Sequence, residues 1–152
     1  MAETVVSLNE QQFTAMRKEK FVLLNTIDAE LETPVVSAIS WIYAVSPTKL
    51  RFALDRRSRM VANLQANPQG VVTYIGFGTV NAIYGKAEVA AEFLEGVPFK
   101  MTCYDFHIDA VRDAMFYGAR ITVDPEYEKT YDKRAAQKLD DQVFSAMEKL
   151  EA

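Results

Sequence analysis

The chain has 152 residues, a length typical of one domain, and 17 lysines and arginines against 21 aspartates and glutamates give a net charge of −4. Its 49% apolar content excludes intrinsic disorder, and its single cysteine and single histidine exclude both a disulfide scaffold and a four-ligand structural zinc site. The acidic balance argues against a nucleic-acid partner. From the length, we expect residues 1–152 to form a single domain.

No stretch of the sequence reaches the roughly 18 apolar residues of a membrane-spanning helix. The first residues, MAETVVSLNEQQ, lack the basic start and apolar core of a secretory signal. We therefore expect a cytoplasmic protein without a membrane partner, a location that also fits the lack of a disulfide framework.

The first predicted element is a short helix. Ser7 and Glu10 are spaced as a capping box, and Phe13 and Met16 supply an apolar face. Residues 21–28 then change to the two-residue alternation of a β-strand.

Two further extended runs follow. A turn ends at Pro34, and residues 34–45 are predicted as one strand whose alternate side chains share a face. A tight turn leads to a strand over residues 49–55. Such short connections predict an antiparallel meander.

Residues 56–67 are predicted to form a helix with an apolar face that includes Leu64. Asp55 is the predicted N-cap, and Asn67 before Pro68 ends the helix.

The second half of the chain continues with strands and ends in a helix. The predicted strands cover residues 70–76, 81–92, 102–108 and 114–123. A helix is predicted from about Asp132, with an apolar stripe formed by Ala136, Leu139, Val143, Ala146, Met147 and Leu150. Six or seven mostly antiparallel strands with peripheral helices predict a mainly β fold, a closed or partly open β-barrel.

Most familiar catalytic motifs are missing. Gly76-Phe77-Gly78 has only two glycines of a dinucleotide motif and lies between predicted strands, so we interpret it as a hairpin turn. Cys103 and His107 would be neighbours on a helix, but on a strand they lie about 13 Å apart, which disfavours a catalytic pair. Carboxylate pairs such as Asp28 with Glu30 and Asp140 with Asp141 are expected to be solvated.

The strongest chemical signal is the junction between the strand over residues 49–55 and the helix after it, where Arg56, Arg57, Ser58 and Arg59 follow one another. Free N–H groups at a helix start attract anions, and arginine and serine add charge and donors. Because the helix dipole disfavours cations there, an anionic partner such as a phosphate would explain three arginines. The alternative is a solvated basic helix end that pairs with Asp55 and nearby acids.

Aromatic residues lie on the strands around this junction. Trp41, Tyr43, Phe52 and Tyr74 could hold a flat ligand whose phosphate reaches the arginines, although most of them, taken one at a time, are better explained as core residues. The chain also has more large aromatic side chains than a narrow barrel interior holds, so some must face outward, as on a partner surface: Trp41, Tyr43, Tyr74, Phe77, Tyr84, Tyr104, Phe106, Phe116 and Tyr117.

Several short motifs resemble the pyridoxamine 5′-phosphate oxidase-like flavin proteins over about residues 8–90. The opening hairpin is similar in Thr26-Ile27-Asp28, the turn to Pro34 and Val35-Val36-Ser37. The strand-helix phosphate segment is similar in Arg51-Phe52-Ala53-Leu54-Asp55, Ser58-Arg59, Asn63-Leu64 and Asn67-Pro68. The C-terminal helix makes the chain look more like the general stress protein branch of this family.

The resemblance implies an FMN-binding split β-barrel, usually a homodimer with FMN at the subunit interface. It assigns phosphate contacts to Arg57, Ser58 and Arg59. The strand Phe52, Ala53, Leu54 and Asp55 would lie along the isoalloxazine ring, and the segment Ser37 to Ser40 together with Thr73 would complete the pocket. The expected activity is an FMN-dependent oxidoreductase with a small-molecule electron donor or substrate.

Two alternatives remain on the same barrel. The first is a stress protein that binds flavin without turnover. The second is a haem-binding or haem-degrading relative, for which His107 is the only histidine available as an axial ligand. The true oxidases end in an Arg-Leu-x-Pro motif where this sequence has MEKLEA, so we expect little pyridoxamine 5′-phosphate oxidase activity.

Overall fold

The structure, a computed structural model, describes residues 4–151 and is mainly antiparallel β, as predicted. Within those residues it has seven strands and three helices. In chain order they are α1 (Glu10–Met16), β1 (Val22–Ile27), β2 (Pro34–Ile39), β3 (Ile42–Ser46), β4 (Lys49–Asp55), α2 (Arg59–Ala66), β5 (Gln69–Gly76), β6 (Thr79–Ala91), β7 (Met101–Asp113) and α3 (Lys133–Glu148).

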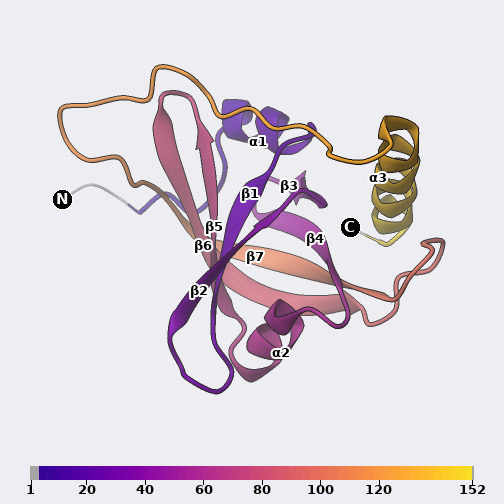
Figure 1. Cartoon of the computed structure of the whole chain (residues 1–152). Coiled ribbons are helices and arrows are strands. Elements are labelled where there is room, and N and C mark those ends of the chain that lie inside the picture. Colours follow the sequence, from indigo (N-terminus) through magenta and orange to yellow (C-terminus); the bar gives the residue numbers. More distant parts are fainter. Residues whose placement is uncertain (1–3, 152) are drawn as a thin grey trace.

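The seven strands form one sheet in the order β2-β1-β5-β6-β7-β4-β3, with every neighbouring pair antiparallel (Figure 1). Both predicted short connections join antiparallel neighbours, β1 with β2 and β3 with β4, but the continuous meander is wrong, because residues 34–45 divide into β2 and β3 at opposite ends of the strand order. On its other side β4 pairs with β7. The segment 92–100 between β6 and β7 therefore lies beside the turn that follows β4, where Arg56 N donates to Lys100 O at 3.0 Å.

The predicted single strand over residues 34–45 is in fact two strands that break at Ser40 and Trp41. β2 pairs with β1, with Val22 opposite Ile39, whereas β3 pairs with β4 at the other end of the strand order. The two-residue link thus joins both edges of a strongly curved sheet, which is the architecture of the predicted split β-barrel (Figure 1).

Two apolar clusters hold the fold together. The larger fills the barrel interior and is centred on Phe52, whose ring stacks on Tyr104 at 5.4 Å and meets Phe106 at 6.2 Å. The smaller joins the outer side of β4 and β7 to the apolar stripe of α3, through residues such as Val143 and Met147. The predicted C-terminal helix and its stripe are confirmed, with Asp132 as N-cap.

The helix starts differ from the predictions. The capping box of α1 is formed by Asn9 and Gln12 rather than by Ser7 and Glu10, because the Asn9 side chain accepts from Gln12 N at 2.8 Å. The N-cap of α2 is Ser58, three residues after the predicted Asp55.

The predicted strand over residues 114–123 is not formed. β7 instead continues to Asp113, and Ala114 N donates the last sheet-like bond to Val80 O. Side chains in the following segment are strongly exposed, including Phe116 and Tyr117, so alternating aromatic residues there have no sheet face to cover. The Gly76–Gly78 hairpin is confirmed, with positive φ at Phe77 and Gly78.

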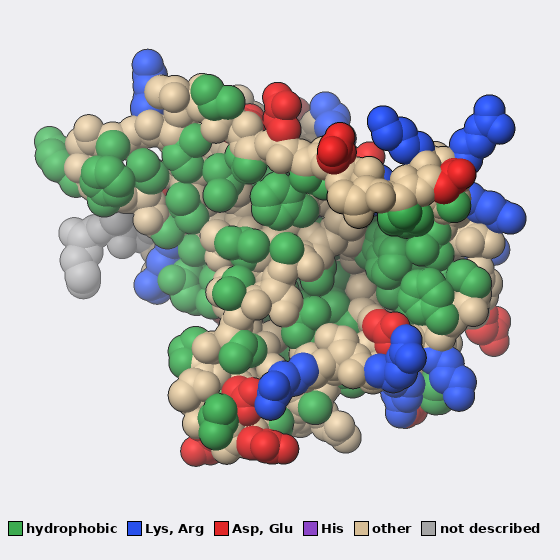
Figure 2. Space-filling model, in the orientation of Figure 1, with side chains coloured by type: hydrophobic (Ala, Val, Ile, Leu, Met, Phe, Trp, Pro, Cys, Tyr) green, Lys and Arg blue, Asp and Glu red, His purple; other side chains and the backbone are tan. Residues whose placement is uncertain are grey.

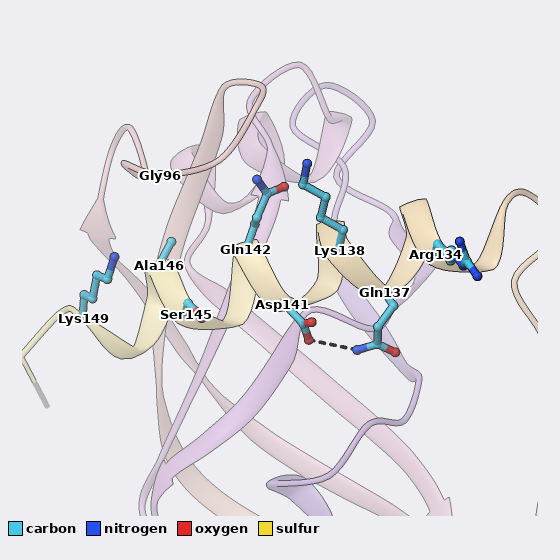
Figure 3. Close-up of a pocket in the computed structure, with 9 residues that line it drawn as sticks. All are labelled: Gly96, Arg134, Gln137, Lys138, Asp141, Gln142, Ser145, Ala146 and Lys149. Atoms are coloured by element: carbon cyan, nitrogen blue, oxygen red, sulfur yellow. Dashed lines mark hydrogen bonds between the residues drawn. The ribbon is translucent and has the colours of Figure 1, made fainter.

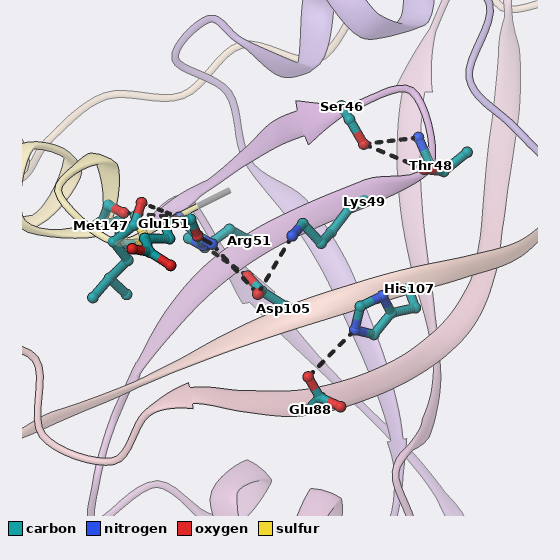
Figure 4. A network of polar contacts seen from close by, with 10 residues as sticks. Ser46, Thr48, Lys49, Arg51, Glu88, Asp105, His107, Met147 and Glu151 are labelled. Carbon is teal, nitrogen blue, oxygen red and sulfur yellow. Dashed lines mark hydrogen bonds and ion pairs between the residues drawn. The ribbon is translucent and has the colours of Figure 1, made fainter.

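A buried arginine connects α3 to the barrel (Figure 4). Arg51 on β4 is 1% exposed, and its guanidinium binds Asp105 of β7 and backbone carbonyls at the end of α3. His107, two residues further along β7, is half exposed and faces Glu88 of β6 at 3.7 Å.

Candidate functional site

The predicted phosphate segment forms a turn between β4 and α2. β4 ends at Asp55, Ser58 N donates to Asp55 O at 2.8 Å, and the Ser58 hydroxyl accepts from Met60 N at 3.2 Å. Arg59 is the first residue of α2, so Arg56 and Arg57 belong to the turn rather than to the helix. Val61 N also donates to Ser58 O at 3.1 Å and Arg57 N to Asp55 Oδ1 at 2.8 Å, so the donors that this turn offers to a ligand are chiefly the three guanidinium groups.

These residues border a cavity of about 630 Å³. In Figure 2, basic side chains gather at the turn between β4 and α2, with acidic side chains next to them. The cavity is lined by Arg56, Arg57, Ser58 and Arg59, by Val61, Ala62, Leu64 and Gln65 of α2, by Ala87 and Val89 of β6, by Glu92, and by Thr102 and Tyr104 of β7. Three arginines and one glutamate give this lining a formal charge of +2.

Each arginine also has an acidic partner. Arg57 pairs with Asp55 at 3.2 Å, and Arg56 pairs with Glu92 at 2.8 Å. The pairing that the sequence allowed as an alternative is therefore present. The guanidinium of Arg57 holds the pKa of the Asp55 carboxyl below its usual value.

Arg59 pairs at 3.1 Å with Asp28, which follows β1. The expectation that Asp28 is solvated is wrong, because it is 3% exposed and accepts hydrogen bonds from the backbone of Glu30 and Leu31. Those bonds, with a smaller contribution from Arg59, hold its pKa below the usual value. Asp140 is likewise buried at 6% exposure, bound to Lys129.

Arg56 is held on several sides. Its guanidinium lies over the Phe93 ring at 4.5 Å and reaches the Thr102 hydroxyl at 3.5 Å. That hydroxyl in turn donates to Glu92 O at 3.1 Å. The start of the 92–100 segment is thus attached to the turn before α2.

The other predicted site residues are distributed over several strands. The side chains of Phe52, Ala53 and Leu54 are buried in the two clusters, and none lines the cavity. Ser37 lies on β2 and Ser40 in the link to β3, both partly exposed. Thr73 on β5 accepts from the Asn25 side chain at 3.1 Å. Within the single chain, the structure brings together the predicted phosphate contacts but not these further residues.

The aromatic residues around the junction are mostly structural. Phe52 is fully buried, Tyr43 packs under α3, and Trp41 Nε1 donates to Asp140 Oδ1 at 2.8 Å. The aromatic residue that does line the cavity is Tyr104, which the sequence analysis named only among the aromatic residues in excess of a barrel interior.

Glu92, Thr102 and Tyr104 are among the lining residues that the predicted site did not include. Alternation placed Thr102 and Tyr104 on one face of a strand, but no sequence signal pairs that strand with β4. Cys103, on the opposite face, is fully buried, and burial raises the pKa of its thiol to about 12. Cys103 and His107 lie on one strand as expected.

A second cavity, of about 570 Å³, lies along the outer side of α3 (Figure 3). Most of the residues that line it have polar or charged side chains, and those of Gln137 and Asp141 bind each other there at 2.9 Å. None of the predicted site residues contributes to it.

Residues 8–114 match the sequence model of the pyridoxamine 5′-phosphate oxidase family. No curated protein has a significant sequence match to the chain. Within residues 4–151, no helix combines the length and apolar character needed to cross a membrane.

Solved structures with the same fold include a candidate pyridoxamine 5′-phosphate oxidase from Lactobacillus delbrueckii, 19% identical, with a TM-score of 0.62 over 71% of this chain and 95% of that one. An F420 reductase is 16% identical, with a TM-score of 0.59 over 69% of this chain and 98% of that one. General stress protein 26 from Bacillus anthracis is 12% identical, with a TM-score of 0.54 over 68% of this chain and 91% of that one. At these identities the likeness establishes the fold alone.

Proposed function

Because the chain belongs to the pyridoxamine 5′-phosphate oxidase family, we propose that it binds FMN with the phosphate at the start of α2. The observation that carries this proposal is the set of three arginines and one serine at a single helix start, on a cavity with a formal charge of +2. A phosphate monoester is close to a dianion at neutral pH, so the donor set fits it in charge and in hydrogen-bonding capacity.

In this proposal Arg57, Ser58 and Arg59 hold the phosphate. Arg59 is oriented by the buried Asp28, and Arg57 by Asp55, so both guanidinium groups are positioned before a ligand arrives. The backbone of β4 from Phe52 to Asp55 is the proposed edge of the flavin ring site, with Ser37, Ser40 and Thr73 completing it.

FMN supplies the electron-transfer chemistry when it is bound, and the protein binds and orients it. Among the lining residues, Glu92 is engaged by Arg56, and burial raises the pKa of Tyr104. These contacts suit a protein that positions a flavin rather than one that supplies a strong base. We propose an oxidoreductase with a small-molecule electron donor or substrate, located in the cytoplasm. Binding of FMN without turnover would leave the same site intact.

We further propose a homodimer with FMN at the subunit interface. Large apolar side chains are exposed on the surface as predicted, among them Phe77, Tyr84, Phe116 and Tyr117. Light scattering should give the mass of a dimer in dilute solution. If the protein keeps the mass of a monomer at saturating FMN, the proposal of a flavin site shared between two subunits is refuted.

The phosphate assignment is tested by titration with FMN and with riboflavin, which lacks the phosphate. Riboflavin should bind much more weakly than FMN, and Arg59→Ala should weaken FMN binding by about 10- to 100-fold, the range for a hydrogen bond to a charged group. Arg134→Ala, on the outer side of α3, is the control and should bind FMN normally.

Equal affinity of the unaltered protein for FMN and riboflavin would refute the phosphate assignment. Because one structural neighbour is an F420 reductase, the same titration should include F420. If F420 binds more tightly than FMN, F420 becomes the proposed cofactor, and the assignment of the anion site at the start of α2 is unchanged. Reoxidation of a reduced nicotinamide in the presence of bound FMN would separate an oxidoreductase from a flavin carrier.

A further inference from the structure

Of the two buried hydroxyl-bearing residues that line the cavity beside α2, Thr102 and Tyr104, one has no hydrogen-bond partner in the fold. Tyr104 on β7 is 4% exposed, and its ring stacks on Phe52 at 5.4 Å. Its hydroxyl makes no hydrogen bond to any of residues 4–151. Buried tyrosines ordinarily place the hydroxyl on a partner, so this one needs an explanation.

The hydroxyl is open to the cavity rather than sealed in the core. Among residues 4–151, every side-chain nitrogen or oxygen that is fully buried in the core has a partner. The Tyr104 hydroxyl has none, so it must reach open space, and the space that Tyr104 borders is the cavity. Thr102, the other polar β7 residue in the lining, has its hydroxyl engaged by Arg56 and by Glu92 O.

The position of Tyr104 relates it to the proposed phosphate site. Arg56 reaches Thr102, and Tyr104 is two residues further along the same strand, roughly 7 Å at the rise of a β-strand. The lining also includes apolar residues, Val61 and Leu64 of α2 and Ala87 of β6. The cavity thus has a cationic end, apolar lining residues and one hydroxyl away from the charge.

We propose that the Tyr104 hydroxyl is a specificity-determining group that binds a polar atom of the flavin away from its phosphate. This inference rests on the proposed function and extends it from the phosphate to the rest of the ligand. A hydroxyl can donate or accept, so it can bind either a carbonyl oxygen or a hydroxyl of such a ligand.

Tyr104→Phe tests this inference, because it removes only the hydroxyl and keeps the stacking on Phe52. The unliganded variant should unfold with the same free energy as the unaltered protein, since no hydrogen bond within the protein is lost. Its affinities for FMN and for riboflavin should both fall by a similar factor, about two- to tenfold. Tyr84→Phe is the matched control, because Tyr84 is an exposed β6 residue outside the cavity.

The outcomes separate this inference from the proposed function. Arg59→Ala should weaken FMN binding but leave riboflavin unchanged, whereas Tyr104→Phe should weaken both. The role of the hydroxyl is overturned if Tyr104→Phe binds both flavins with unchanged affinity, or if the unliganded variant is less stable than the unaltered protein. The proposal that the protein binds FMN is unaffected by either outcome. If the unaltered protein binds neither flavin, the proposed function fails, and the role of Tyr104 fails with it.

Discussion

Replacing Arg51 with methionine should detach α3 from the barrel. The Arg51 side chain is 1% exposed, and its guanidinium binds both carboxylate oxygens of Asp105, at 2.7 and 3.3 Å. It also donates to the carbonyls of Met147, Leu150 and Glu151 at 3.1, 3.3 and 2.6 Å. Met147 O also accepts from Leu150 N at 3.2 Å, whereas Leu150 and Glu151 lie beyond the last turn of α3, so Arg51 ties the end of the helix and the residues after it to β4.

Methionine matches the length of the arginine stem but supplies no donor. Asp105 then keeps only Lys49, 3.7 Å away. Removing one partner of a buried ion pair costs about 3–5 kcal/mol, which corresponds to a fall in Tm of about 6–20 °C for a chain of this size. Most of the loss should appear as faster amide exchange in α3, because the barrel core does not depend on this contact.

Urea unfolding measures the total loss, and hydrogen exchange locates it. Arg112→Met, at an exposed position on β7, is the control and should cost less than about 1 kcal/mol. A loss of under about 1 kcal/mol for Arg51→Met, or unchanged exchange in α3, would refute the idea that Arg51 anchors this helix.

Three further outcomes are expected. Burial lowers the pKa of Lys20 to about 7, below its unfolded value, so the folded state binds fewer protons between the two values. The free energy of unfolding should therefore rise from pH 7 to 10. In Lys20→Met it should change less over the same pH range, and urea unfolding at several pH values measures the difference. Cys103 should resist iodoacetamide in the native protein at pH 8 and react after unfolding, because it is fully buried with a pKa of about 12, which mass spectrometry checks. His107→Gln should leave flavin content within a few-fold, since His107 lies outside the cavity, whereas a haem-loaded protein that loses haem on this change would favour the haem-binding alternative.

Sequence reasoning predicted the local elements better than their pairing. The alternation of residues 21–28, the strand over residues 49–55 and the stripe of α3 are properties of neighbouring residues, and the structure confirms them. The break at Ser40 and Trp41 carries no glycine or proline. It arises because the chain passes from one edge of the sheet to the other, a requirement of barrel closure that no local pattern encodes.

The candidate site divides in the same way. Arg57, Ser58 and Arg59 are adjacent in sequence, so composition alone could mark them. Glu92, Thr102 and Tyr104 reach the same cavity only because β7 pairs with β4, where Leu54 lies opposite Thr102 and Phe52 opposite Tyr104. Such contacts between residues about fifty positions apart depend on strand order, and the sequence analysis assigned no pairing partner to β7.

The acidic partners of the three arginines are not equivalent toward a ligand. Asp28 and Asp55 do not line the cavity, so they can keep Arg59 and Arg57 oriented while an anion binds from the other side. Glu92 does line the cavity and holds Arg56 within it, so a bound phosphate would lie near this carboxylate. Like charges repel, and the anion is therefore best accommodated at Arg57 and Arg59. With this asymmetry the proposed phosphate would bind at a helix start whose arginines are all paired with acids, without displacing Asp28 or Asp55.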